Sequence, residues 1–131
     1  MKKIIFSDED VKKLIELIES KEHKAVYCFP EFNGIWIRDK GFETELRLLI
    51  LADIRVTVSR VCFSNRRQGL MTDIYYYLKE FCKEHNVHQI MIQSVETKEM
   101  ANWCVKHGFK PNPSSSLKLE EFVCGDYIMD V

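Results

Sequence analysis

Three stretches of the chain carry apolar residues every three or four positions, the spacing that places them on one face of a helix. These stretches are residues 7–20, 72–85 and 97–107. Ser7 and Thr97 stand at the start of the first and third stretches, and both residue types are good helix N-caps. The sequence therefore predicts three amphipathic helices.

Short apolar or alternating stretches bounded by turn residues fill the rest of the chain and are typical of strands. The predicted strands cover residues 2–6, 25–29, 35–37, 43–51, 54–63, 87–94, the segment from Phe109, 121–124 and 127–131. Glu43–Leu51 also fits a helical turn, and the turn residues on either side favour the strand. Residues 111–116, which read Pro-Asn-Pro-Ser-Ser-Ser, are expected to form a loop.

The order of these elements predicts an α+β fold. A strand and a helix are followed by several strands, a helix, a strand, a helix and the last strands. This order fits a three-layer α/β arrangement, with a mixed, mostly antiparallel central sheet and helices on both faces. With 131 residues, the chain is expected to form a single domain over residues 1–131.

Composition narrows the function classes. The net charge of −1 argues against nucleic acid as a partner, because phosphate contacts need a clustered positive face. No apolar stretch reaches the ~20 residues that span a bilayer, so we expect no membrane association. The five cysteines are scattered without a Cys-x-x-Cys pair, which fits a reduced, cytoplasmic protein. No Cys or carboxylate pattern completes a site around His85 and His88, so no metal is expected.

The candidate chemistry lies in the turn between a predicted strand and the second helix, where residues 61–71 read VCFSNRRQGLM. The first N–H groups of a helix have no intrahelical partner, and the helix dipole adds about half a positive charge there. Gly69 lets the backbone approach an anion without an intervening Cβ, and Arg66 and Arg67 add positive charge. The turn is therefore a candidate phosphate site; a solvated strand-to-helix turn is the alternative.

The spacing Arg66-x-x-Gly69-x-Met71 resembles the acyl-CoA pyrophosphate loop of the GNAT-type N-acetyltransferases, usually written Arg/Gln-x-x-Gly-x-Gly/Ala. Residues 103–109, WCVKHGF, are similar to the closing helix of that family, which ends in Gly-Phe. Residues 127–129 resemble its final strand. The resemblance covers the chain from the strand before the loop to the last residue, and the earlier part matches only in the order of its elements.

By this resemblance we expect the GNAT fold and an acetyl-CoA-dependent N-acetyltransferase. It would move an acetyl group to a primary amine of a small molecule or protein by direct attack on the thioester. Acyl-CoA would enter where the strand ending at Phe63 splays from the strand at 87–94. The residues implied in cofactor binding are Val61, Phe63, Arg66, Arg67, Gln68, Gly69, Leu70, Met71, Thr72 and Thr97. The acceptor amine stays unidentified, and a homodimer is left open.

Several positions depart from the family's pattern. Met71 stands where Gly or Ala is preferred, and Thr97 where Asn is frequent. Cys104 stands where many members carry the Tyr that protonates the leaving thiolate, which makes Cys104 the candidate catalytic acid; a small core residue is the alternative. The strand before the loop lacks the usual Glu base, and Glu43, Glu45 or a water chain could replace it. A non-catalytic GNAT-fold module that binds acyl-CoA or a protein is therefore the second hypothesis.

Overall fold

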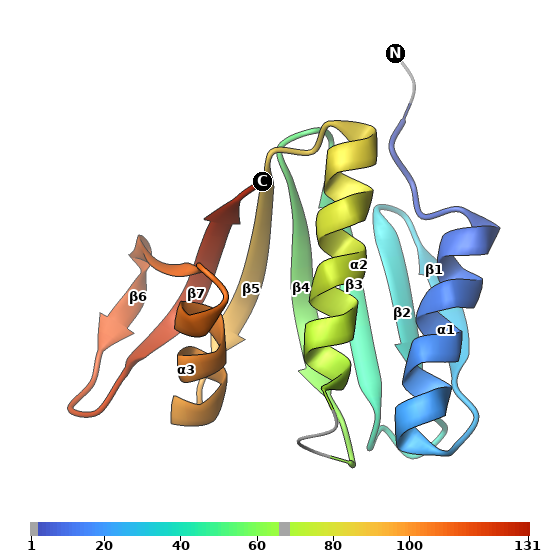
Figure 1. Cartoon of the computed structure of the whole chain (residues 1–131), viewed down its shortest axis with the longest axis horizontal. Helices are drawn as coiled ribbons and strands as arrows, with labels where there is room; N and C mark the ends of the chain where they lie inside the picture. The colour runs from blue at the N-terminus through green and yellow to red at the C-terminus, as the bar shows by residue number, and fades with distance from the viewer. Residues whose placement is uncertain (1–2, 66–68) are drawn as a thin grey trace.

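The chain folds into a seven-stranded sheet covered by helices (Figure 1). This computed structural model describes residues 3–65 and 69–131. The elements are α1 (Asp8–Glu22), β1 (Tyr27–Glu31), β2 (Gly34–Arg38), β3 (Glu45–Leu51), β4 (Arg55–Cys62), α2 (Leu70–His85), β5 (Gln89–Val95), α3 (Lys98–Lys106), β6 (Lys110–Lys118) and β7 (Val123–Asp130). Within the described ranges, no helix is both long and apolar enough to cross a membrane.

The sheet is mixed and mostly antiparallel, as the sequence predicts. Its strand order is β1-β2-β3-β4-β5-β7-β6, and among the described strands β4 and β5 are the only neighbours that pair in parallel. The chain passes from β4 to β5 through α2, because a parallel pair needs a long crossover connection. The predicted α+β class, the mixed sheet and the strand preferred for Glu43–Leu51 are confirmed.

The three helices of the described chain lie on one face of the sheet (Figure 1), whereas helices on both faces were expected. Leu48, Val58 and Ile92 stand in one row across β3, β4 and β5 and are at most 2% exposed, so their side of the sheet is the covered one. Leu14 and Ile18 of α1 join the same core. The crossovers from β4 to β5 and from β5 to β6 step in the same direction along the sheet. Right-handed connections of that kind place both helices on one face.

The opposite face carries polar and aromatic side chains. Trp36, Arg47 and Arg60 stand in one row across β2, β3 and β4. Arg47 forms an ion pair with Glu31 at 2.7 Å, and Arg60 forms one with Glu45 at 3.1 Å. An antiparallel sheet commonly has one such face turned to solvent.

The described part of the N-terminal segment, residues 3–6, does not form the predicted first strand. Phe6 is buried and stacks on Phe81 of α2, with ring centroids 4.6 Å apart. This packing draws the segment onto the helical layer instead of the sheet edge. Ser7 then caps α1 as predicted: its Oγ accepts the N–H of Asp10, and the Asp10 carboxylate accepts the N–H of Ser7.

The C-terminal hairpin also differs from the prediction. Residues 111–116, expected as a loop, lie within β6, and the two predicted final strands form the single strand β7. Pro111 pairs with Tyr127 and Ser116 pairs with Gly125, and the register shifts between these pairs as in a bulge. Gly125 has a φ of 116°, and a Cβ there would lie 2.3 Å from a carbonyl oxygen of β6. The glycine therefore permits a close strand contact instead of ending the strand.

Candidate functional site

β4 and β5 separate at the end of the sheet where α2 begins. They pair over Val56–Val58 and Ile90–Ile92, whereas β4 continues to Cys62 and β5 to Val95. Figure 1 shows the two strands diverging toward this end. The splay expected between these strands is therefore present.

A bulge accompanies the separation on each strand. In β4, the register against β3 shifts by one residue at Ser59. In β5, Ser94 has a φ of 55°, and its N–H donates to the Asp126 carboxylate at 2.9 Å. Because a bulge bends its strand and increases the local twist, the two bulges account for the opening between the strand ends.

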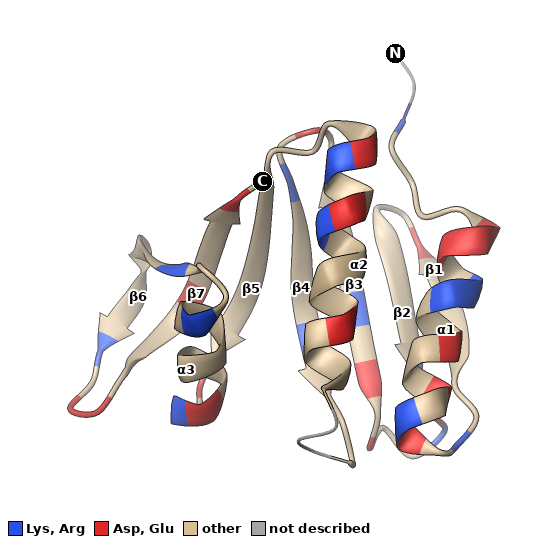
Figure 2. Ribbon diagram, in the orientation of Figure 1, with Lys and Arg blue, Asp and Glu red and all other residues tan. Residues whose placement is uncertain are grey.

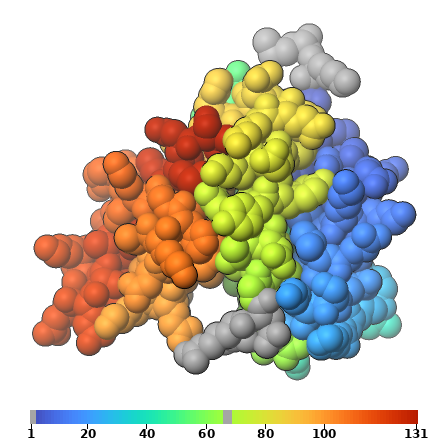
Figure 3. Space-filling model, viewed as in Figure 1, coloured from blue at the N-terminus to red at the C-terminus, as the bar shows by residue number. Residues whose placement is uncertain are grey.

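A cavity of about 590 Å³ lies between the end of β4 and the first turns of α2 and α3. Figure 3 shows the surface hollowed between α3 and the start of α2. The cavity is lined by Val61, Cys62, Phe63, Asn65, Gly69, Leu70, Met71, Thr72, Thr97, Glu99, Met100, Asn102 and Trp103. All the expected cofactor residues that can be placed are in this set, whereas Arg66, Arg67 and Gln68 lie outside the described residues.

The N-terminus of α2 opens into this cavity without a side-chain cap. Gly69 is the N-cap residue, with a φ of 77° in the left-handed region that favours glycine. The N–H of Asp73 donates to the Gly69 carbonyl at 3.0 Å, so the amides of residues 70–72 precede the first intrahelical bond. Among the described residues, a Cβ on Gly69 would meet no atom within 4 Å. The amides, the dipole and the open space together make this terminus a candidate site for an anion.

Trp103 joins the cavity from α3 and was not predicted as a site residue. Its indole N–H donates to Thr72 Oγ at 3.1 Å. The indole ring stacks on His107 at 4.3 Å between centroids, and the ring of Tyr75 meets it edge-on at 5.6 Å. Thr72 Oγ accepts this bond and keeps one hydroxyl proton of its own to donate. The helical spacing of residues 97, 100 and 103, which share one face of α3, is the sequence signal for this residue.

No family model matches the sequence, and no curated protein matches it. Solved structures do match. Ard1 from Thermoplasma volcanium has a TM-score of 0.54 at 10% identity, over 96% of this chain and 80% of that one. The PaiA N-acetyltransferase from Thermoplasma acidophilum, in complex with coenzyme A, has a TM-score of 0.52 at 10% identity, over 95% and 72%.

A third match is the ribosomal-protein-S18-alanine N-acetyltransferase from Escherichia coli, with a TM-score of 0.50 at 13% identity, over 99% of this chain and 92% of that one. The chain has the GNAT N-acetyltransferase fold. In this GNAT fold the splayed strands, the glycine turn and the cavity occupy one end of the sheet. The residues singled out by the sequence resemblance that can be placed lie at this same end of the molecule.

Two departures from the GNAT pattern can now be placed. Thr97 caps α3, because its Oγ accepts the N–H of Met100 at 3.2 Å, and Thr97 also lines the cavity. Met71 is half-buried and packs against the core while still lining the cavity. Neither side chain fills the space in front of Gly69.

Cys104, the candidate acid, lies in the core of the GNAT domain. It is 0% exposed and is absent from the residues that line the described cavity. Burial raises the pKa of its thiol to about 12. An acid must reach the leaving group within hydrogen-bonding distance, directly or through one water. The position of Cys104 offers no such path in this structure and matches the alternative of a small core residue.

The two carboxylates weighed as bases are also held elsewhere. Glu45 is buried on the uncovered face of the sheet, where it accepts hydrogen bonds from Trp36 Nε1 at 3.0 Å and from Arg60 at 3.1 Å. The hydrogen bond to Glu45 raises the pKa of Arg60. Glu43 lies 3.6 Å from Lys24 Nζ. Neither glutamate lines the cavity, so neither is placed to take a proton there.

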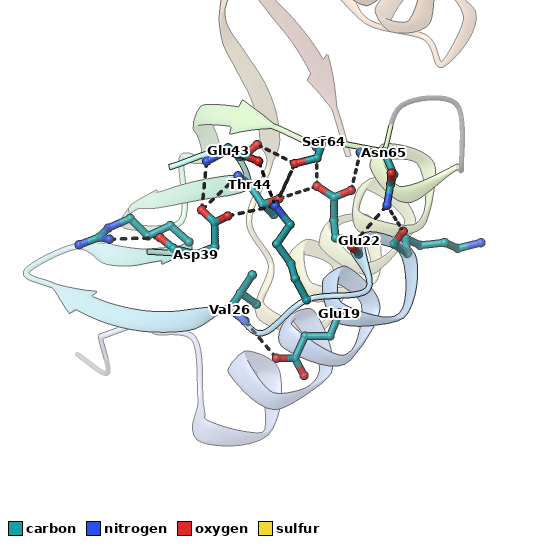
Figure 4. A network of polar contacts seen from close by, with 11 residues as sticks. Glu19, Glu22, Val26, Asp39, Glu43, Thr44, Ser64 and Asn65 are labelled. Carbon is teal, nitrogen blue, oxygen red and sulfur yellow. Dashed lines mark hydrogen bonds and ion pairs between the residues drawn. The ribbon is translucent and has the colours of Figure 1, made fainter. Parts of the chain in front are cut away.

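A network of carboxylates borders the site where β4 ends (Figure 4). Glu22, the last residue of α1, is 3% exposed and binds the turn at Ser64 and Asn65. Lys24 Nζ donates to Asp39 and to Ser64 Oγ, both at 3.0 Å. Burial by itself would raise the pKa of Asp39, but the hydrogen bond and charge of Lys24, together with the N–H groups of Thr44 and Glu43, outweigh it and the pKa is lowered. These contacts join residues far apart in the sequence, which is why sequence patterns did not reveal them.

Proposed function

We propose that this protein is an acetyl-CoA-dependent N-acetyltransferase that acetylates a primary amine. The observation that carries the proposal is the cavity beside the splayed end of β4, which ends on the uncapped N-terminus of α2. The pyrophosphate of acetyl-CoA would bind the amides of residues 69–72, and the pantetheine would run along Val61 and Phe63. Arg66, Arg67 and Gln68 complete the proposed cofactor residues on the resemblance in sequence.

The cavity suits this co-substrate in size and in chemistry. Its volume of about 590 Å³ lies within the range of small-molecule sites. Backbone amides and the Thr72 hydroxyl are donors, which is what phosphate oxygens require. The apolar side chains of Val61, Phe63 and Trp103 offer packing for the pantetheine arm. Thr97 would lie beside the same arm at the start of α3.

Catalysis would proceed by attack of a neutral amine on the thioester. The thiolate that leaves has an ordinary thiol pKa of ~8.5, so solvent can protonate it near neutral pH. A positioned side-chain acid typically contributes about 10²–10⁴-fold, and Cys104 is not placed to supply it. We therefore propose acetyl transfer that depends on orientation in the cavity, at a correspondingly lower rate.

The burial of Cys104 also favours a second candidate function: a non-catalytic module that binds acyl-CoA or a protein. Both candidates use the same cofactor site, so cofactor binding alone does not separate them. Acetyl transfer to an acceptor does. We further propose a cytoplasmic location, because all five cysteines are free thiols.

The test is calorimetric titration of the purified protein with acetyl-CoA, followed by an acceptor screen read by mass spectrometry. We expect micromolar binding and a product heavier by one acetyl group. Binding without any acetylated acceptor would favour the module. Absence of binding would contradict both candidates in their acyl-CoA form.

Replacing Cys104 by Ala separates its two assigned roles. As a core residue, its loss should reduce the free energy of unfolding by about 1–2 kcal/mol. The rate of acetyl transfer per folded molecule should stay within about twofold, because no proton path is removed. Chemical denaturation and a rate assay on the same preparation measure both quantities. A loss of about 100-fold in kcat with unchanged stability would restore Cys104 as the acid.

A further inference from the structure

The carboxylate of Glu22 accepts hydrogen bonds from two other segments of the chain (Figure 4). Its Oε1 accepts the Thr44 hydroxyl and the Ser64 N–H, both at 2.6 Å, and its Oε2 accepts the Asn65 N–H at 2.7 Å. Thr44 precedes β3, and Ser64 and Asn65 follow β4. A single buried side chain at the end of α1 therefore holds the chain where it leaves the sheet.

Two consecutive backbone amides on one carboxylate fix the direction of the chain as well as its position. Asn65 is held a second time, because its side-chain amide donates to the carbonyls of Lys21 at 3.1 Å and Glu22 at 3.3 Å. Ser64 is also held twice, since its hydroxyl accepts from Lys24 Nζ. A buried carboxylate is costly without hydrogen bonds, so this arrangement is stable only while the turn keeps its place.

The turn held by Glu22 opens directly onto the candidate cofactor site. Asn65 lines the cavity, and Gly69, four positions later, is the N-cap residue of α2. The connection is short, and both of its ends are anchored: one by Glu22 and the other by the core packing of α2. The amides of Ser64 and Asn65 donate to Glu22, so they do not bind an anion. The amides at the start of α2 are the ones that can.

We propose that Glu22 is a positioning residue for the cofactor site: it fixes the end of β4 so that the cavity and the amides of α2 face one ligand together. The inference rests on the proposed function, because acetyl-CoA is the ligand it concerns. Glu22 itself touches no ligand in this assignment. Its effect is on cofactor affinity through the turn at Ser64 and Asn65.

The experiment compares Glu22→Gln with Glu19→Gln. Both change a carboxylate on α1 into an amide of the same shape, but Glu19 accepts the N–H of Val26, away from the turn. In Glu22→Gln the new NH₂ group meets an N–H donor that the carboxylate accepted. We expect acetyl-CoA affinity to fall about tenfold or more in Glu22→Gln, and to stay within about twofold in Glu19→Gln.

Thr44→Val is the control for stability. It removes the hydroxyl that donates to the same carboxylate and lies 3.4 Å from Ser64 Oγ, and it leaves both amide contacts intact. We expect it to lower the melting temperature and leave acetyl-CoA affinity unchanged. In steady-state assays Glu22→Gln should raise the KM for acetyl-CoA with kcat preserved, a split that a lower folded fraction does not produce.

Equal acetyl-CoA affinity in Glu22→Gln and wild type would overturn the inference and leave the proposed function standing. A wild-type protein that binds no acetyl-CoA would overturn the proposed function and the inference with it. If Glu22→Gln does not fold, Glu22→Asp takes its place, because it keeps the charge and shortens the side chain by one methylene group. The same loss of affinity is expected from it, and unchanged affinity would again overturn the inference.

Discussion

The N-termini of α1 and α2 both expose backbone N–H groups, but only α1 has a side-chain cap. At α1, Ser7 and Asp10 close the terminus by exchanging hydrogen bonds of 2.9 and 3.1 Å with each other's backbone. At α2, Gly69 provides no side chain, and its left-handed φ of 77° turns the chain into the helix. The first helix satisfies free amides with side chains of its own first turn, whereas the N-cap residue of the second provides no side-chain hydrogen bond.

The charges at the two termini follow the same division. The first turn of α1 holds three acidic residues, whereas the first turn of α2 holds only Asp73 (Figure 2). Negative side chains neutralise the positive end of α1 and repel an anion there. The positive end of α2 keeps more of its field for a bound group. A helix N-terminus is therefore an anion site only where the sequence leaves it uncapped.

Adding a side-chain cap to the N-terminus of α2 should have the largest effect on acetyl-CoA affinity. Gly69→Asp places a carboxylate on the amides of residues 70–72 and adds a negative charge where the pyrophosphate would bind. Each charge-assisted hydrogen bond contributes about 1.5–3 kcal/mol, so acetyl-CoA affinity should fall by about 100-fold or more. Calorimetry measures the loss, and circular dichroism confirms that the variant is folded.

Gly69→Ala is the matched control for backbone strain. Its Cβ meets no atom within 4 Å in the part of the chain that the structure describes, and the left-handed φ costs about 1–2 kcal/mol of stability. Acetyl-CoA should still bind it measurably. Equal affinity in the wild type and in Gly69→Asp would show that α2 does not hold the anion.

Weakening the N-terminal cap of α1 should lower the stability of the protein and leave its acetyl-CoA affinity unchanged. Asp10→Asn removes the charged half of the capping box and weakens the hydrogen bond from the Tyr77 hydroxyl. We expect a loss of about 1 kcal/mol in the free energy of unfolding at pH 7, with unchanged acetyl-CoA affinity. Denaturant titrations of both proteins provide the comparison.

The pH dependence of that difference has a definite sign. Burial by itself would raise the pKa of Asp10, but hydrogen bonds from Tyr77 and Ser7 outweigh it and the pKa is lowered. A carboxyl with a lowered folded pKa adds stability above its unfolded pKa of ~3.9 and loses it as the pH falls through the folded value. The gap between wild type and Asp10→Asn should therefore shrink below about pH 4. A gap that widens in acid would contradict the role assigned to Asp10.

Local sequence patterns correctly predicted the features that depend on local contacts, such as helix caps. The cap of α1 at Ser7 and the cap of α3 at Thr97 depend on a few neighbouring residues, and both are present. The first strand failed because burial of Phe6 against Phe81, a contact across the fold, outweighed its strand pattern. The hydrophobic periodicity of a segment does not show which distant segment it packs against.

The candidate site divides in the same way. The glycine turn was predictable because its residues are consecutive. The bonds of Glu22 to Ser64 and Asn65 span 42 and 43 positions, and no motif links them. The position of Cys104 matched a family pattern, but its burial depends on how α3 packs on the sheet. A resemblance can therefore place a residue on the right helix without showing which neighbours surround its side chain.

The smallest expected effect concerns the hydrogen bond that Trp103 adds to the open terminus. Trp103→Phe keeps a ring in the cavity wall and removes the indole N–H that donates to Thr72 Oγ at 3.1 Å. One neutral hydrogen bond contributes about 1 kcal/mol, so acetyl-CoA affinity should fall about three- to fivefold.

Trp36→Phe is the control, because Trp36 lies on the uncovered face of the sheet and its loss should leave affinity unchanged. It also leaves Trp103 as the single tryptophan, so acetyl-CoA should change its fluorescence in that variant. If calorimetry reports binding but the fluorescence does not change with acetyl-CoA, the ligand lies away from α3. The N-terminus of α2 would then bind the anion without a contribution from Trp103.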